Sequence, residues 1–146
     1  AIFHPGDHAN RKRDFSGPYA AEIDFLAKNN MKPDLLFTPV SGCGFGDQVA
    51  VKKGAYYAVK KLSPAVWFPM HAGGGEERYR EFAREANEKG LKTPLFCAES
   101  SGDRFFFRKG ADKLSGVFTP TSLKGVEGNG KMKKKKSAAS CKAKTQ

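Results

Sequence analysis

Hydrophobic residues follow two different spacings along the first two thirds of the chain. Short apolar runs, typical of buried strands, occupy residues 1–4, 34–40, 65–70, 93–98 and 104–108. Between the runs, apolar residues recur every three or four positions, which predicts helices over residues 19–28, about 48–62 and 76–89. This order predicts an α/β fold with a mixed sheet, crossover helices and a closing hairpin between the last two strands.

Length and composition are those of one globular domain. The 146 residues are 39% hydrophobic and 12% aromatic, which is enough for a hydrophobic core. No run approaches about 18 apolar residues, so we expect no membrane contact through a spanning helix. The first residues lack the features of a signal peptide. Because the chain opens inside an apolar strand and without methionine, we expect a front segment of the protein to be missing from it.

Positive charge is concentrated in the last quarter of the chain. Residues 1–110 carry 17 Lys and Arg against 13 Asp and Glu, whereas residues 111–146 carry nine against two. The second segment loses the apolar periodicity and contains the run Lys133, Lys134, Lys135 and Lys136. We therefore predict a folded domain over residues 1–110 and a disordered, basic C-terminal tail over residues 111–146.

The cysteines indicate a reducing compartment. There are three of them, Cys43, Cys97 and Cys141, and no pair has C-x-x-C spacing. An odd number without that spacing argues against a disulfide framework and against a zinc ribbon. We accordingly expect a cytoplasmic protein.

Two predicted strand ends carry side chains that can bind a metal ion. Asp7 follows the first strand and His71 follows the third. A carboxylate and an imidazole are ordinary ligands for zinc and similar ions. If the two strands are neighbours in one sheet, their ends meet at one rim. His8, beside Asp7, is a candidate contact for substrate or metal at the same rim.

Three segments, taken together and in order, resemble the C-terminal half of metallo-β-lactamase-fold hydrolases. They are Gly6-Asp7 at a strand end, Asp34–Gly42 in the pattern D-x-x-x-x-P-x-x-G, and Ser63–His71. The last segment is similar to the family's K-P-x-x-x-x-P-M-H, with Ser63 in place of the lysine. The closest subgroup is the lactonase-like metal-dependent hydrolases, and the resemblance covers roughly residues 1–109.

This resemblance implies a fold and a chemistry. The fold would be half of a four-layer αββα sandwich, with the metals at one edge of the paired sheets. By resemblance, Asp7 is the catalytic carboxylate that bridges two metal ions, and His71 is the last metal-binding histidine. The implied cofactor is two divalent ions, zinc with manganese or iron as alternatives. A metal-bound hydroxide would hydrolyse a small ester-, lactone- or phosphate-like substrate.

The sequence also departs from this family. The family's H-x-H-x-D-H signature is absent, and the only histidines are His4, His8 and His71. We therefore expect the other ligands to come from an N-terminal half or from a second copy of the chain. Hydrolase activity is then expected of the full-length protein.

A non-catalytic function is the alternative. An α/β binding module could use Lys133, Lys134, Lys135 and Lys136 to contact nucleic acid or another anionic surface. This alternative predicts salt-sensitive binding that is lost when residues 131–146 are deleted. The hydrolase hypothesis predicts that the same deletion leaves metal-dependent hydrolysis unchanged.

Overall fold

The computed structural model describes residues 1–41, 46–73, 75, 77–100, 102–110 and 114–119. These residues fall into two units. The first contains residues 1–97, and the second begins at Ala98. Each unit is described by itself below.

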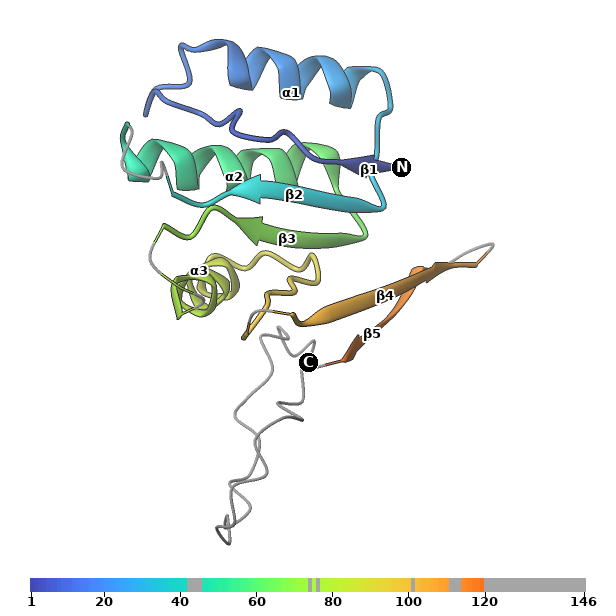
Figure 1. Ribbon diagram of the computed structural model, residues 1–146. Coiled ribbons are helices and arrows are strands. Elements are labelled where there is room, and N and C mark those ends of the chain that lie inside the picture. The colour runs from blue at the N-terminus through green and yellow to red at the C-terminus, as the bar shows by residue number, and fades with distance from the viewer. Residues whose placement is uncertain (42–45, 74, 76, 101, 111–113, 120–146) are drawn as a thin grey trace, which may run out of the picture. The chain divides into compact units, whose positions relative to one another are not determined.

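The first unit alternates strands and helices. Its elements are β1 (Ile2–Phe3), α1 (Pro18–Lys28), β2 (Leu35–Pro39), α2 (Gln48–Leu62), β3 (Val66–Met70) and α3 (Glu77–Glu88). The strands form a parallel sheet in the order β1-β2-β3, so β2 is central and all three strands end at the same edge (Figure 1). The predicted α/β class is therefore confirmed.

Local signals explain where the crossover helices begin and end. Helix α1 begins at Pro18, whose fixed φ and missing N–H suit the first helical position. The carboxylate of Asp47 accepts hydrogen bonds from the N–H groups of Val49 and Ala50 and so caps α2. At the other end of α2, Ser63 adopts a left-handed conformation with φ 45°, and Pro64 prevents the helix from continuing.

The cap of α2 predicts a dependence of stability on pH. The Arg13 guanidinium donates a hydrogen bond to Asp47 and, with the capping N–H groups, holds the pKa of the Asp47 carboxyl below its usual value. Because the pKa is lower in the folded state, the charged form stabilises the fold above about pH 4, and this contribution is lost as the pH falls through the folded pKa.

The variant Asp47→Asn tests this dependence, because asparagine also caps helices but carries no charge. We expect wild type to be more stable than Asp47→Asn at pH 7, with the difference shrinking below about pH 4. Urea unfolding at pH 7, 5, 4 and 3 measures it. A difference that stays constant across this series would contradict the assignment.

One face of the sheet forms the hydrophobic core with all three helices. The fully buried residues of this core are Ile23 of α1, Leu36 of β2, Val59 and Leu62 of α2, Trp67 of β3, and Phe82 of α3. The indole of Trp67 lies edge-on to the rings of Tyr56 and Phe82, with centroids 6.1 and 5.1 Å away. The indole N–H donates to the Thr38 hydroxyl at 2.7 Å, so its one polar group is satisfied inside the core.

The opposite face of this sheet carries a row of aromatic rings. His4 lies 5.1 Å from Phe37, Phe37 stacks on Phe68 at 5.1 Å, and Phe68 lies 6.0 Å from Phe96, measured between ring centroids. Because side chains alternate along a strand, these residues point away from the helices, whose core partners are Leu36 and Trp67. Ile2, at the edge of the row, is 69% exposed. The three described helices thus leave this apolar face without a helical layer.

The second unit contains a hairpin. Strand β4 (Arg104–Lys109) pairs antiparallel with β5 (Leu114–Thr119). Exposed and half-buried residues alternate along the first five residues of β4, so Arg104, Phe106 and Arg108 share the more exposed face.

Two predictions about this region were wrong. The first is the hairpin predicted between residues 93–98 and 104–108, because residues 93–98 do not form a strand. Leu95 instead makes a single parallel bridge beside Trp67 of β3. Proline at position 94 supplies a carbonyl to the Trp67 N–H but has no N–H for a ladder, which limits the pairing. The real partner of β4 is β5, a strand inside the segment assigned to the tail.

Two further observations concern the cysteines and the membrane. Cys97 is buried and disulfide-bonded, against the expectation from the cysteine count, and Cys43 and Cys141 lie outside the described residues. Within the described residues, no helix is both long and apolar enough to cross a membrane.

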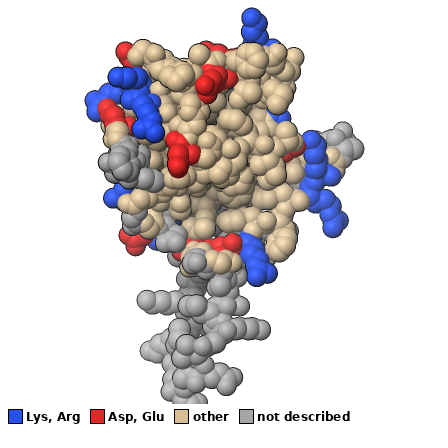
Figure 2. All heavy atoms as spheres, turned by 45° about the horizontal axis from the view of Figure 1, so that its top comes forward, with Lys and Arg blue, Asp and Glu red and all other residues tan. Residues whose placement is uncertain are grey.

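Charge is unevenly spread over the surface. Figure 2 shows one face of the molecule, on which most side chains are uncharged, several Asp and Glu side chains lie within this uncharged area, and lysines and arginines lie mainly towards its margins.

Candidate functional site

Three strand ends meet at one rim of the parallel sheet. The chain leaves β1 through a turn to Asp7, leaves β2 at Ser41 and leaves β3 at His71. Since the strands are parallel neighbours, these three positions lie at the carboxyl edge, where open parallel sheets carry their sites.

The structure brings Asp7 and His71 together at this rim, although the expected neighbours β1 and β3 are separated by β2. Nδ1 of His71 lies 3.3 Å from Oδ1 of Asp7. The Asp7 side chain is 87% exposed and that of His71 is 30% exposed. The pair is therefore anchored on the histidine side and open to ligands on the carboxylate side.

The backbone holds His71 in an unusual conformation. Its φ is +58°, in the left-handed region that non-glycine residues seldom occupy. The Ser41 hydroxyl donates to the His71 carbonyl, and the Val40 N–H donates to the Met70 carbonyl at 3.0 Å. Strained residues held in this way are found at functional sites, so this geometry is consistent with a functional role for His71.

A tight turn presents Asp7. Gly6 has φ 61°, which favours glycine, and the His8 N–H donates to the Pro5 carbonyl at 3.1 Å. The Gly6 N–H donates to Nδ1 of His4 at 3.2 Å. His4 thus supports the turn through its ring nitrogen and contacts Phe37 through its ring face.

His8 points to a different place from the one expected. Its Nε2 pairs with the Glu22 carboxylate of α1, and its ring lies 5.2 Å from the ring of Tyr19. These contacts place the imidazole against α1, and none of the described contacts joins His8 to His71. The predicted contact of His8 with substrate or metal is thus without support from the described geometry.

The separation of Asp7 and His71 fits two ligands of one metal ion. Two donors bound to a tetrahedral ion at about 2.05 Å stand about 3.3 to 3.4 Å apart, which matches the observed 3.3 Å. A protein zinc site uses three or four protein ligands. Within the described residues, no group of three or more His, Cys, Asp or Glu side chains is placed to hold an ion. Among the described residues, the rim thus offers two candidate ligands and no complete metal site.

Sequence reasoning missed three residues that support the rim. Ser41 follows β2, and its hydroxyl donates to the His71 carbonyl. The Ala72 N–H donates to the Tyr79 hydroxyl at 3.4 Å, and Arg78 donates to the Ala72 carbonyl at 3.3 Å. Tyr79 and Arg78 lie in α3, and no local sequence signal connects them with the end of β3.

Comparisons with protein families, with curated proteins and with solved structures found no match for this chain.

The lysine run Lys133, Lys134, Lys135 and Lys136, predicted as the nucleic-acid contact of the alternative function, lies outside the described residues.

Proposed function

We propose that this chain supplies a carboxylate and an imidazole to the divalent-metal site of a hydrolase of the metallo-β-lactamase superfamily. The observation that carries the proposal is the Asp7–His71 pair, 3.3 Å apart at the carboxyl edge of a parallel sheet. The Gly6-Asp7 turn and the Pro69-Met70-His71 strand end also resemble that superfamily. By this resemblance, both members of the pair are metal ligands.

The two faces of the sheet support the same proposal. All three helices of the first unit pack on one face, and the other face carries the row His4, Phe37, Phe68 and Phe96. Phe68 in this row is already buried, whereas Ile2 on β1 at the edge of the same face is 69% exposed. A second sheet packed against that edge would bury apolar surface, as a four-layer αββα sandwich requires. In this proposal the second sheet comes from an N-terminal half of the protein, or from a second copy, and brings the remaining ligands.

Each rim residue then has a definite task. Bound divalent ions, zinc or else manganese or iron, would supply a hydroxide at neutral pH and stabilise the oxyanion that forms on a small ester, lactone or phosphate ester. Asp7 offers an exposed carboxylate to the ions, and His71 offers Nδ1. Ser41 fixes the backbone of His71, so the imidazole is already positioned before anything binds.

Titration with Mn²⁺ tests the metal site on this chain alone. Two ligands bind weakly, but paramagnetic Mn²⁺ broadens NMR signals near even a weak site. We expect the amide signals around Asp7 and His71 to broaden first, and the variants Asp7→Ala and His71→Ala each to weaken this broadening by more than about tenfold in Mn²⁺ concentration.

Matched controls use the same residue types elsewhere in the first unit. Asp14→Ala and His8→Ala remove a carboxylate and an imidazole that are not part of the pair, since the His8 ring contacts Glu22 and Tyr19 of α1, and they should leave the broadening unchanged. Broadening centred on other residues, or equal in all four variants, would refute the metal site.

Hydrolysis is tested on this chain together with the N-terminal half or second copy that the proposal requires. A panel of lactones, nitrophenyl esters and phosphate esters should reveal metal-dependent activity that a chelator removes and that Asp7→Ala abolishes. Metal binding without hydrolysis in any member of the panel would leave a metal-binding protein and overturn the enzymatic part of the proposal.

A further inference from the structure

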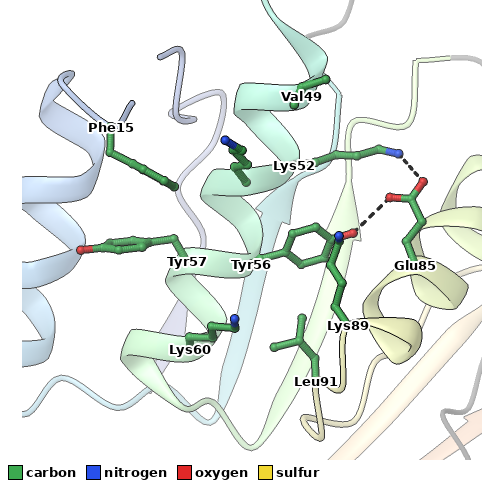
Figure 3. Close-up of a pocket in the computed structure, with 10 residues that line it drawn as sticks. Phe15, Val49, Lys52, Tyr56, Tyr57, Lys60, Glu85, Lys89 and Leu91 are labelled. Carbon is green, nitrogen blue, oxygen red and sulfur yellow. Dashed lines mark hydrogen bonds and ion pairs between the residues drawn. The ribbon is translucent and has the colours of Figure 1, made fainter. Parts of the chain in front are cut away.

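A second concave surface lies on the helical side of the first unit, away from the sheet rim. It is an open groove of about 750 Å³ over the outer surface of α2, bounded by residues near α1 on one side and by α3 on the other (Figure 3). Its lining consists of Phe15, Val49, Lys52, Lys53, Tyr56, Tyr57, Lys60, Glu85, Lys89 and Leu91. Its volume lies within the range of small-molecule sites, about 300 to 1,000 Å³.

The charge of this groove is strongly positive. Four of its ten lining residues are lysines, and Glu85 is its one carboxylate. Glu85 is already engaged, because its Oε1 lies 2.7 Å from Nζ of Lys52 and its Oε2 accepts a hydrogen bond from the Tyr56 hydroxyl at 3.2 Å (Figure 3). Although partial burial opposes it, Lys52 holds the pKa of Glu85 below its usual value. Three lysines remain unbalanced within the groove.

The positions of these three lysines leave their charge available. Nζ of Lys53 reaches only the Arg13 carbonyl, at 3.4 Å, and Nζ of Lys89 lies over the Tyr56 ring, 5.5 Å from its centroid. Lys60 has no hydrogen bond or ion pair with any residue in the described part of the chain and rises from α2 beside the groove (Figure 3). None of the three forms an ion pair with Glu85, although Lys89 also interacts with that carboxylate electrostatically.

The floor between these lysines is apolar and firmly supported. The inner face of Tyr56 stacks on Phe82, with ring centroids 5.2 Å apart, and Phe15 lies 5.0 Å from Tyr57. Leu91 is packed against the core and lines the same groove. Tyr56 is itself only 9% exposed, because Phe82 stacks on it and Nζ of Lys89 lies over its ring. The apolar surface that a ligand can reach therefore comes mainly from Val49, which is 47% exposed, and from the half-buried Leu91.

We propose that this groove binds a small phosphorylated molecule with a flat apolar body, of the nucleoside-phosphate class. The body lies beside Tyr56, between Val49 and Leu91, and the phosphates contact Lys53, Lys60 and Lys89. An uncharged flat molecule would leave the lysines unused, and a bare phosphate would leave the apolar floor exposed to water. The groove is separate from the Asp7–His71 pair, so this inference goes beyond the proposed hydrolase function.

Calorimetric titration with three probes tests the proposal. ADP carries both the flat body and the phosphates, adenosine carries the body alone, and pyrophosphate carries the charge alone. We expect ADP to bind saturably and at least about fivefold more tightly than either of the other two. The titrations contain EDTA, so metal-bridged binding of ADP at Asp7 and His71 does not contribute, and failure here is distinct from failure of the hydrolase proposal.

Charge reversal at matched positions locates the binding. Lys60→Glu changes a groove lysine and should weaken ADP binding by about fivefold or more. Lys32→Glu makes the same change of net charge at an exposed lysine outside the groove, and it should alter the affinity less than twofold. Thermal unfolding of both variants shows that they remain folded.

Four results would overturn the proposal. The first is that ADP does not bind saturably, and the second is that pyrophosphate binds as tightly as ADP. The third is that Lys60→Glu and Lys32→Glu weaken ADP binding equally. The fourth is that a single-stranded oligonucleotide binds tightly and is not displaced by ADP. The second and third would mean attraction by net charge alone, and the fourth would mean a nucleic-acid surface.

Discussion

Replacement of Trp67 by alanine is expected to lower the free energy of unfolding by about 3 to 5 kcal/mol. Trp67 is 0% exposed and is the largest fully buried side chain among the described residues. It joins central strand β2, through Thr38, to the aromatic residues of α2 and α3. Truncation would remove these contacts and leave a cavity that the surrounding helices cannot fill. Urea unfolding measures the change.

The control for Trp67→Ala is Phe25→Ala, which removes an aromatic ring that is 66% exposed. We expect the free energy of unfolding of this variant to lie within about 1 kcal/mol of the wild-type value. If the two variants lose similar stability, the core does not depend on Trp67 in the way described here.

The hydrogen bond from Trp67 to Thr38 can be separated from packing by a double-mutant cycle. Thr38→Val keeps the volume but leaves the indole N–H unpaired in the core, which is expected to cost about 1 to 3 kcal/mol. Trp67→Phe removes the donor, and the double variant should then be more stable than the sum of the single effects predicts. Additive effects would mean that the 2.7 Å bond contributes nothing of its own.

Replacement of Gly54 by alanine is expected to destabilise the protein by about 2 kcal/mol, although alanine is the better helix former by about 1 kcal/mol. A Cβ at Gly54 would overlap Cβ of Asn10 and stand 3.2 Å from the Tyr19 ring. Asn10 cannot move aside easily, because its side-chain amide donates to the carbonyls of Lys12 and Ala50 at 2.8 and 2.9 Å. The glycine therefore lets the loop before α1, and Tyr19 of α1, approach α2.

The control for Gly54→Ala is Lys53→Ala, at the neighbouring exposed position of the same helix. For this variant we expect the free energy of unfolding to change by less than about 0.5 kcal/mol, because no packing is disturbed. Thermal and urea unfolding of both variants measure the two changes. A stabilised Gly54→Ala variant would show that helix propensity outweighs the close approach.

Most of the fold elements could be predicted, because their signals are local. The stripe Val51, Ala55, Val59 and Leu62 predicted the buried side of α2, and all four residues are buried. The strands at residues 35–39 and 66–70 were read from continuous apolar runs and observed within one residue of their expected bounds. The hairpin was wrong because a strand's partner is chosen by the assembled sheet, not by the nearest turn.

The candidate site was predicted in part. Asp7 and His71 follow β1 and β3, which flank β2 in one parallel sheet, so both residues lie at the same edge of that sheet. His8 has the same local setting as Asp7, yet its side chain turns to Glu22. One residue of difference along a tight turn reverses the direction of a side chain, and sequence spacing does not reveal which neighbour it meets.

By itself, the sequence determined the order and type of the main elements, since periodicity and caps act over a few residues. Only the tertiary structure decided that Ser41 would hold His71, that three helices would share one face of the sheet, and that lysines of α2 and the lysine that follows α3 would border one groove. These arrangements depend on contacts between residues far apart in the chain. Such contacts arise from strand order and helix packing, for which no short segment carries a signal.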